Sequence, residues 1–247
     1  MNSEEEKTPT ARGKALFDAW PDAYDRWFTT PVGRLVKEYE LGVIRELLEP
    51  AAGEHILDAG CGTGIFTRDF LAAGARITGI DISLPMLLRA KEKAGGDPLL
   101  LLAGDILRLP FVEEAFDKTV SVTALEFIRD AGAAVRELFR VTKRGGFIVV
   151  ASLNSLSPWA ARRKAEAQMK PDSIFREALF RSPDELRALA PVAGTIRSAV
   201  HFRKDEEQDK IGESERRGRQ AGLLTGAFVA IRWKKPGKRR RQEKGRS

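Results

Sequence analysis

The sequence has a single cysteine, Cys61, and no long apolar run. One cysteine excludes an internal disulfide and argues against a metal site built from thiolates. No stretch reaches the roughly 18 apolar residues of a membrane-spanning helix, and the longest run, at 99–103, has the length of a strand. The first residues, MNSEEEKTPT, are acidic and polar where a secretory signal would be apolar. These absences predict a reduced, cytoplasmic compartment, with no membrane span and no bound metal.

Charge is not spread evenly along the chain. The formal net charge is +7, but residues 232–247 alone hold nine Lys or Arg and one Glu. The remainder is therefore close to neutral. A basic tail can bind phosphates, yet terminal extensions are more often solvated and disordered. We expect disorder at 235–247 and in the polar residues 1–13.

Between these ends the sequence divides into two regions. Residues 14–50 are predicted to form two helices separated at Thr30-Pro31, because aromatic and aliphatic side chains recur at helical spacing. In the second region, 51–234, short Ile/Val/Leu-rich runs alternate with amphipathic stretches, which is typical of a doubly wound, mostly parallel α/β sheet. Strands are expected at 55–59, 76–81, 99–103, 118–123, 147–152, 195–202 and 225–233, and helices at 65–73, 85–94, 131–141 and 158–169. The almost wholly charged stretch 203–220 is predicted to be a mobile loop.

A glycine-rich turn follows the first of these strands. The segment HILDAGCGTG places Gly60, Gly62 and Gly64 at alternate positions where a strand ends and a helix should begin. Glycine allows a sharp turn and a close approach of ligand to backbone. The third glycine comes one residue too early for the GxGxxG dinucleotide fingerprint, and no GxxxxGK[ST] phosphate loop is present. A nucleotide-like ligand without a pyrophosphate is therefore indicated.

Acidic residues end the first three strands in succession. Asp58 precedes the turn, Asp81 ends the second strand and Asp105 follows the third. Open α/β sheets bind ligands at the carboxyl ends of their strands, so these three acids are expected at one ligand-binding edge.

Together these features resemble class I S-adenosylmethionine-dependent methyltransferases, in the small-molecule branch that includes the ubiquinone- and menaquinone-biosynthesis type. The resemblance is close over about 55–152 and looser beyond. It implies a Rossmann-like, seven-stranded sheet with an antiparallel last strand, an N-terminal helical lid and S-adenosylmethionine as cofactor. In the family the three acids hold the amino group, ribose and adenine of the cofactor. The cofactor residues that the resemblance implies are Tyr24, Asp58, Ala59, Gly60, Cys61, Gly62, Gly64, Asp81, Ile82, Met86, Gly104, Asp105, Ile106 and Thr123.

The acceptor side is less well defined. Aromatic residues of the lid and of later segments are candidates for an acceptor pocket, or for ordinary packing: Trp20, Trp27, Phe28, Phe127 and Trp159. Many relatives have a histidine where Phe127 stands, so a histidine-assisted mechanism is in doubt. The catalytic residues stay unassigned, and Tyr24, Glu40, Glu126 and His201 are weak candidates for a general base.

The expected function is in-line methyl transfer to a small molecule. Two alternatives stay open at this point. One is an RNA- or protein-modifying methyltransferase that docks through the basic tail, and the other is a non-catalytic protein that binds the cofactor. Neither the oligomeric state nor the methylated atom can be predicted from these residues.

Overall fold

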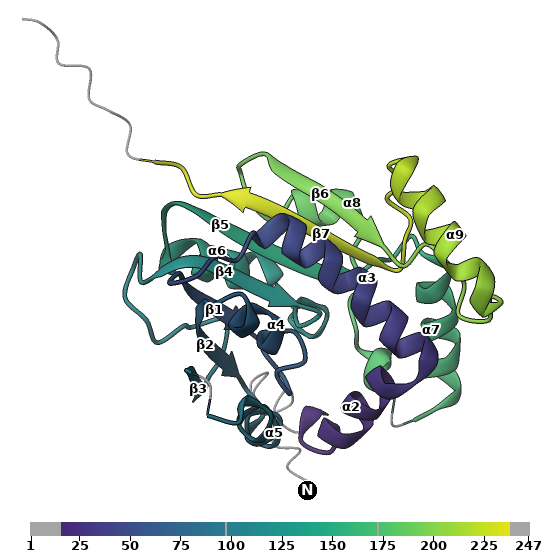
Figure 1. The fold of residues 1–247 in the computed structure, drawn as a ribbon, viewed down its shortest axis with the longest axis horizontal. Helices are drawn as coiled ribbons and strands as arrows, with labels where there is room; N and C mark the ends of the chain where they lie inside the picture. Colours follow the sequence, from purple (N-terminus) through teal and green to yellow (C-terminus); the bar gives the residue numbers. More distant parts are fainter. Residues whose placement is uncertain (1–15, 97, 172, 238–247) are drawn as a thin grey trace, which may run out of the picture.

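The computed structural model describes residues 16–96, 98–171 and 173–237 (Figure 1). The segments predicted to be disordered, 1–13 and most of the basic tail, lie outside these residues. Lys235, which was assigned to the tail, is an exception. Its backbone exchanges hydrogen bonds with Gly145 and Gly146 at 2.8 and 2.9 Å, so the ordered chain continues past 234 and the predicted tail boundary was wrong.

The fold is built on a seven-stranded sheet with the order β3-β2-β1-β4-β5-β7-β6. Strand β7 is antiparallel to β5 and β6, and the other pairs are parallel. The predicted Rossmann-like sheet with an antiparallel last strand is therefore confirmed. The strands are β1 (His55–Ala59), β2 (Arg76–Asp81), β3 (Leu99–Ala103), β4 (Phe116–Val122), β5 (Thr142–Leu153), β6 (Gly194–Ala199) and β7 (Phe228–Lys234).

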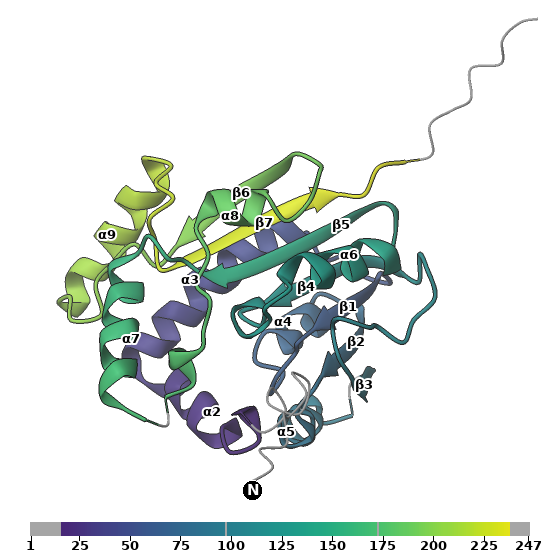
Figure 2. The ribbon, with the colours of Figure 1, turned by 180° about the vertical axis from the view of Figure 1, so that it is seen from behind.

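Helices cover both faces of this sheet, as Figures 1 and 2 show from opposite sides. Successive residues of a strand point to opposite faces, so Ile56 and Val149 join one apolar cluster while Leu57 and Ile148 join the other. The first cluster includes side chains of α3 and α4, and the second includes side chains of α6 and α8. The helices are α2 (Pro21–Thr29), α3 (Pro31–Leu48), α4 (Thr67–Ala72), α5 (Leu84–Ala94), α6 (Ala131–Val141), α7 (Pro158–Met169), α8 (Pro183–Arg187) and α9 (Gln208–Gln220), with short 3₁₀ turns η1 (Leu125–Phe127) and η2 (Ile174–Arg176).

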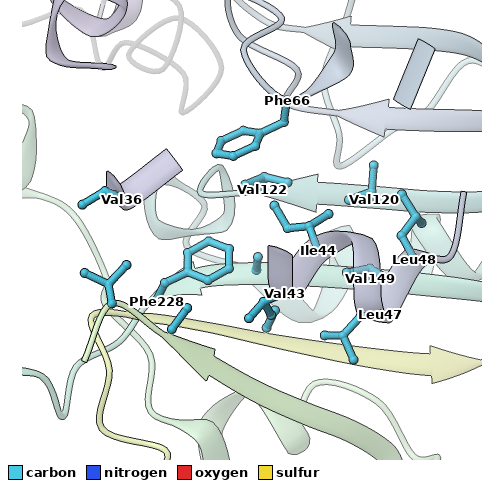
Figure 3. Close-up of a cluster of buried hydrophobic side chains, with 14 of the residues drawn as sticks. Val36, Val43, Ile44, Leu47, Leu48, Phe66, Val120, Val122, Val149 and Phe228 are labelled. Carbon is cyan, nitrogen blue, oxygen red and sulfur yellow. The ribbon is translucent and has the colours of Figure 1, made fainter. Parts of the chain in front are cut away.

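Helix α3 anchors the N-terminal region to the sheet. Figure 3 shows Ile44 and Leu47 of this helix beside Val120 and Val149 of the central strands. All four side chains are fully buried or nearly so. Burying a side chain of this size contributes about 1.5–3 kcal/mol, so this face fixes where α2 and α3 lie relative to the carboxyl ends of the strands.

The predicted mobile loop 203–220 is wrong over most of its length, because 208–220 forms α9. The helix buries Ile211, Glu215 and Gly218 at spacings of three and four residues. Gly218 lies directly against the ring of His201, where a β-carbon would come within 2.3 Å. Only one of the three buried residues is a large apolar side chain, so the helical stripe was not visible in the hydrophobic pattern.

No helix among the described residues is long and apolar enough to cross a bilayer.

Candidate active site

The glycine turn lies between β1 and α4. Gly60, Gly62 and Gly64 have φ angles of 77°, 53° and 74°, in the left-handed region that favours glycine. A β-carbon on Gly60 would lie 2.4 Å from the β-carbon of Ala124, whereas one on Gly62 would meet nothing within 4 Å. The turn is therefore packed against the segment after β4 at its first glycine and open at its second. That opening fits a ligand that approaches the backbone closely.

Asp81 is tied into this turn. Its side chain accepts hydrogen bonds from the backbone N–H groups of Gly62 and Ser83, at 2.8 and 2.9 Å. Burial raises the pKa of the Asp81 carboxyl, and the backbone donors oppose that rise. The carboxyl group therefore both fixes the turn and stands at the carboxyl end of β2.

The other two strand-end acids lie on the same edge of the sheet. Asp58 is 2% exposed and accepts a hydrogen bond from the Thr67 hydroxyl at 2.7 Å. Burial raises the pKa of Asp58 to about 7. Asp105 accepts a hydrogen bond from the backbone of Leu107 at 2.9 Å, which closes a short turn after β3. The strand register places Asp58 beside Gly79, and Asp81 beside Ala103, so the three acids lie at the carboxyl ends of neighbouring strands.

The remaining predicted cofactor residues line this edge or lie beneath it. Met86 and Ile106 are 4% and 8% exposed. Cys61 is buried and burial raises the pKa of its thiol, which agrees with a small packing residue and not with a nucleophile. The backbone N–H of Gly104 donates to the backbone carbonyl oxygen of Asp81 at 2.9 Å. Ala59 ends β1, and Ile82 follows Asp81 at the end of β2.

Acidic residues of the N-terminal region bind to α5 and to the glycine turn. Asp18 accepts a hydrogen bond from the Ser83 hydroxyl at 2.7 Å, and Asp22 pairs with Arg89. Asp25 accepts hydrogen bonds from Thr63 at 2.7 Å and from Lys93 at 2.5 Å. These three acids are spaced one helical turn apart, so one face of this region faces the cofactor edge. We call these contacts the lid contacts.

A second group of polar side chains lies between α2, α3, η1 and α7. Its members are Tyr24, Glu40, Glu126 and Arg163, and we call it the buried charge cluster. Glu40 and Glu126 are 5% and 0% exposed. Burial raises the pKa of Glu40 to about 8 and that of Glu126 to about 7, and it raises the pKa of the Tyr24 hydroxyl well above its ordinary value. Three weak candidates for a general base are therefore brought together.

Thr123 connects this cluster to the sheet. It follows β4 with a φ of 48°, which is strained for a β-branched residue and is found most often at functional sites. Its N–H donates to Ala151 of β5 at 2.9 Å. Its hydroxyl neighbours the Tyr24 hydroxyl, and this contact lowers the Tyr24 pKa against the effect of burial.

The fourth candidate base, His201, is not part of the cluster. Its ring lies against Gly218 of α9, and its Nε2 is 3.3 Å from the carbonyl oxygen of Ser198.

The aromatic candidates are divided among several environments. Trp159 is 3% exposed and donates its indole N–H to Phe202 at 2.7 Å, and Phe28 packs edge-on between Tyr24 and Phe66. The other three are partly exposed: Trp20 before α2, Trp27 beneath the Lys204 ammonium, and Phe127 edge-on to Phe17.

Sequence reasoning missed two arginines at this site. Arg163 of α7 joins the cluster, and Arg181 donates to the carbonyl oxygens of Leu125 and Ile128 at 2.6 and 3.0 Å, which fixes η1 and Glu126. Arg163 lies in the run Arg162-Arg163-Lys164, which has the composition of a solvated helix face. Only the fold shows which of these three cations points inward.

The mostly parallel sheet, the open glycine turn and three acids at its carboxyl edge define a class of protein, the nucleotide-binding α/β proteins of Rossmann-like fold. Comparisons with known proteins agree. Residues 57–150 match the family model described as "Methyltransferase domain". The chain is 40% identical over 192 residues to a malonyl-[acyl-carrier protein] O-methyltransferase of Serratia marcescens, covering 69% of this chain and 72% of that protein.

Two further similarities extend over more of the chain. A demethylmenaquinone methyltransferase of Thermobifida fusca (strain YX) is 29% identical over 211 residues, covering 76% of this chain and 87% of that protein. The structure of a SAM-dependent methyltransferase from Thermotoga maritima, a possible histamine N-methyltransferase, superposes with a TM-score of 0.70 at 24% identity, covering 90% of this chain and 99% of that one. The chain belongs to the S-adenosylmethionine-dependent methyltransferase family. It is a methyltransferase, and S-adenosylmethionine is its cofactor.

Proposed function

We propose that this enzyme methylates a small molecule by in-line displacement, with the acceptor bound at the buried charge cluster. The observation that carries the proposal is the position of that cluster. Tyr24 of the lid neighbours Thr123 at the end of β4, and the adjacent residue Ala124 packs on Gly60 of the glycine turn. An acceptor at the cluster would therefore lie beside a cofactor bound at the turn.

The residues at the edge fit the groups of the cofactor. We propose that Asp58 attracts the amino group, that Asp81 accepts from the ribose hydroxyls and that Asp105 accepts from the adenine amine. When bound, the cofactor supplies a methyl group already activated by a sulfonium. The remaining tasks of the protein are to align the acceptor and to exclude water.

The relatives support a small acceptor. Their names specify demethylmenaquinone and malonyl-[acyl-carrier protein], so in each the methylated group belongs to a small molecule or to a short carried acyl unit. The buried charge cluster offers a few converging polar side chains, which is how proteins orient small ligands. We therefore favour a small-molecule acceptor over a nucleic acid or a folded protein.

Isothermal titration with S-adenosylhomocysteine tests the placement of the cofactor. Asp81→Ala removes the ribose acceptor and also two hydrogen bonds that hold the turn. We expect its affinity to fall by about 10-fold to 100-fold, since a hydrogen bond to a charged group contributes roughly 1.5–3 kcal/mol. Glu113→Ala, at an exposed loop acid, is the matched control and should bind normally. Unchanged affinity of Asp81→Ala would overturn the assignment.

Removal of residues 238–247 tests whether the tail recruits the acceptor. A small-molecule enzyme should keep its turnover without the tail. A marked loss of turnover that is largest at low salt and shrinks as salt is raised would instead favour docking on a polyanion, because salt weakens docking by the intact tail.

A further inference from the structure

Arg181 is a buried arginine that lies between η2 and α8, far along the chain from the glycine turn. It is 8% exposed. Its guanidinium donates to the backbone carbonyl oxygens of Leu125 at 2.6 Å, Ile128 at 3.0 Å and Leu179 at 3.2 Å. Burying a guanidinium is costly unless it is well hydrogen-bonded. The three carbonyl contacts meet that cost, and they connect Arg181 to the backbone of η1.

The backbone of Arg181 is itself fixed to the end of β5. Its N–H donates to the carbonyl oxygen of Leu153, and its carbonyl oxygen accepts from the N–H of Ser155, both at 3.2 Å. Between these two contacts it forms a parallel bridge with Asn154. Arg181 therefore joins the segment after β4 to the segment after β5, at the carboxyl ends of two neighbouring strands.

The turn η1 is held more tightly from outside than from within. The two hydrogen bonds that close it are each 3.2 Å long. The contacts that it receives are shorter: Arg181 donates to Leu125 at 2.6 Å, and the N–H of Leu179 donates to the carbonyl oxygen of Glu126 at 2.7 Å. A single 3₁₀ turn has poor hydrogen-bond geometry of its own. The position of η1 is therefore set by Arg181 and its neighbour.

The glycine turn packs against the start of η1. Ala124 is the N-cap residue of η1, and its β-carbon fills the space beside Gly60, where an added β-carbon would lie 2.4 Å away. The N–H of Gly60 donates to the carbonyl oxygen of Ile80 in β2 at 2.7 Å. The first glycine of the turn is thus held between β2 and η1. A shift of η1 would remove one of these two supports.

We infer that Arg181 is a positioning residue for the cofactor site. It holds Ala124 against Gly60 through η1, and so keeps the glycine turn in the conformation that binds the cofactor. The inference rests on the proposed placement of the cofactor at this turn. The shape of the guanidinium suits the task, because its Nη1 donates to Leu125 and its Nη2 to Ile128, one at each end of η1. An ammonium group has no such planar fork.

Isothermal titration with S-adenosylhomocysteine tests this role. Arg181→Met keeps an unbranched side chain but removes every donor, and we expect affinity to fall by about 10-fold. Arg181→Lys keeps the charge without the fork and should bind at least about 3-fold weaker than wild type. It also provides the measurement if Arg181→Met does not fold. Affinity within about 2-fold of wild type in both variants would overturn the inference.

A double-mutant cycle with Ala124→Gly separates positioning from a general loss of stability. Ala124→Gly removes the β-carbon that packs on Gly60, so in this background Arg181 no longer acts on the turn. Arg181→Met should then weaken binding by less than about 2-fold, against about 10-fold in wild type. An equal loss of affinity in both backgrounds would show that Arg181 does not act through Ala124.

Ser182→Ala is the matched control for stability. The Ser182 hydroxyl caps α8 by accepting from the N–H of Glu185 at 3.2 Å, so its removal should lower stability without loosening η1. Urea unfolding should show that Ser182→Ala and Arg181→Met are both destabilised, whereas only Arg181→Met should bind weakly. A similar loss of affinity in both would contradict a positioning role.

Asp81→Ala, titrated alongside, distinguishes the two ways to fail. Normal binding by Asp81→Ala would mean that the proposed cofactor placement is wrong. Weak binding by Asp81→Ala with normal binding by both Arg181 variants would leave that placement intact and reject only the role of Arg181.

Discussion

The cofactor edge and the buried charge cluster are built in different ways. The cofactor edge comes from one continuous segment, 58–106, in which three strands end in succession and the backbone makes many of the contacts. The cluster is assembled by side chains from α2, α3, η1 and α7, which are far apart in the sequence. A local turn tolerates little change, because each residue depends on its backbone conformation. A site made of side chains on separate helices can exchange them one at a time, so the same cofactor can serve different acceptors.

The largest expected effect comes from a substitution that disrupts the cofactor edge at Gly60. Gly60→Ala puts a methyl group 2.4 Å from the β-carbon of Ala124 and forces a side chain into φ 77°. Gly53→Ala is the matched control, because Gly53 has φ 81° but nothing within 4 Å of an added β-carbon. The control should cost only the conformational strain, about 1–2 kcal/mol.

Gly60→Ala should lower the free energy of unfolding by about 1–3 kcal/mol more than the Gly53→Ala control does. It should also weaken S-adenosylhomocysteine binding by about 100-fold, because the turn must shift to relieve the clash. Urea unfolding and isothermal titration measure the two effects. Equal stabilities of the two alanine variants, with normal binding by Gly60→Ala, would show that the turn is less constrained than its geometry implies.

The difference between the cofactor edge and the buried charge cluster also explains which features could be predicted from the sequence. The sheet and the glycine turn were predicted because their signals are local: alternating apolar runs, glycine spacing, and acids at strand ends. Helix α9 was missed because its buried face consists of an isoleucine, a glutamate and a glycine, which no hydrophobic period reveals. Arg163 was missed because Arg162, Arg163 and Lys164 are chemically alike in sequence, and tertiary packing alone selects the inward one. Glu40 and Glu126 were only weak candidates until the structure showed that both side chains are buried in one cluster.

A second prediction concerns the buried charge cluster through its effect on stability. The pKa of Glu40 is about 8 in the folded protein, against an ordinary value of 4.5. The folded state therefore holds this proton more tightly than the unfolded state. The sign of the pH dependence follows from this difference in proton affinity. The contribution of Glu40 to the free energy of unfolding is most favourable below about pH 4.5, and it is lost progressively as pH rises towards 8. Glu40→Gln removes that loss.

Urea unfolding at pH 5 and pH 8 measures this effect as a double difference. Between these two values, wild type should lose about 3–4 kcal/mol more stability than Glu40→Gln. Buried acids outside the cluster, such as Asp58, titrate in both proteins and cancel. Glu38→Gln, on the exposed face of the same helix, should behave as wild type. A pH dependence of Glu40→Gln identical to that of wild type would show that Glu40 stays ionised in the folded protein.

The smallest expected effect lies in the lid contacts, where the two regions meet. Asp22–Arg89 is a surface pair, with side chains 70% and 37% exposed, and such pairs contribute little. Asp25–Lys93 is less exposed, at 19% for each side chain, and Asp25 also accepts from Thr63 of the glycine turn. Asp25→Asn should therefore weaken S-adenosylhomocysteine binding by about 3-fold to 10-fold, whereas Asp22→Asn should change it by less than about 2-fold. Raising the salt concentration should reduce the difference between wild type and Asp25→Asn only slightly, because partly buried charges are poorly screened. If the two variants bind alike, the N-terminal helices do not close over the cofactor edge through Asp25, and the acceptor side has to be positioned by α3 and α7 alone.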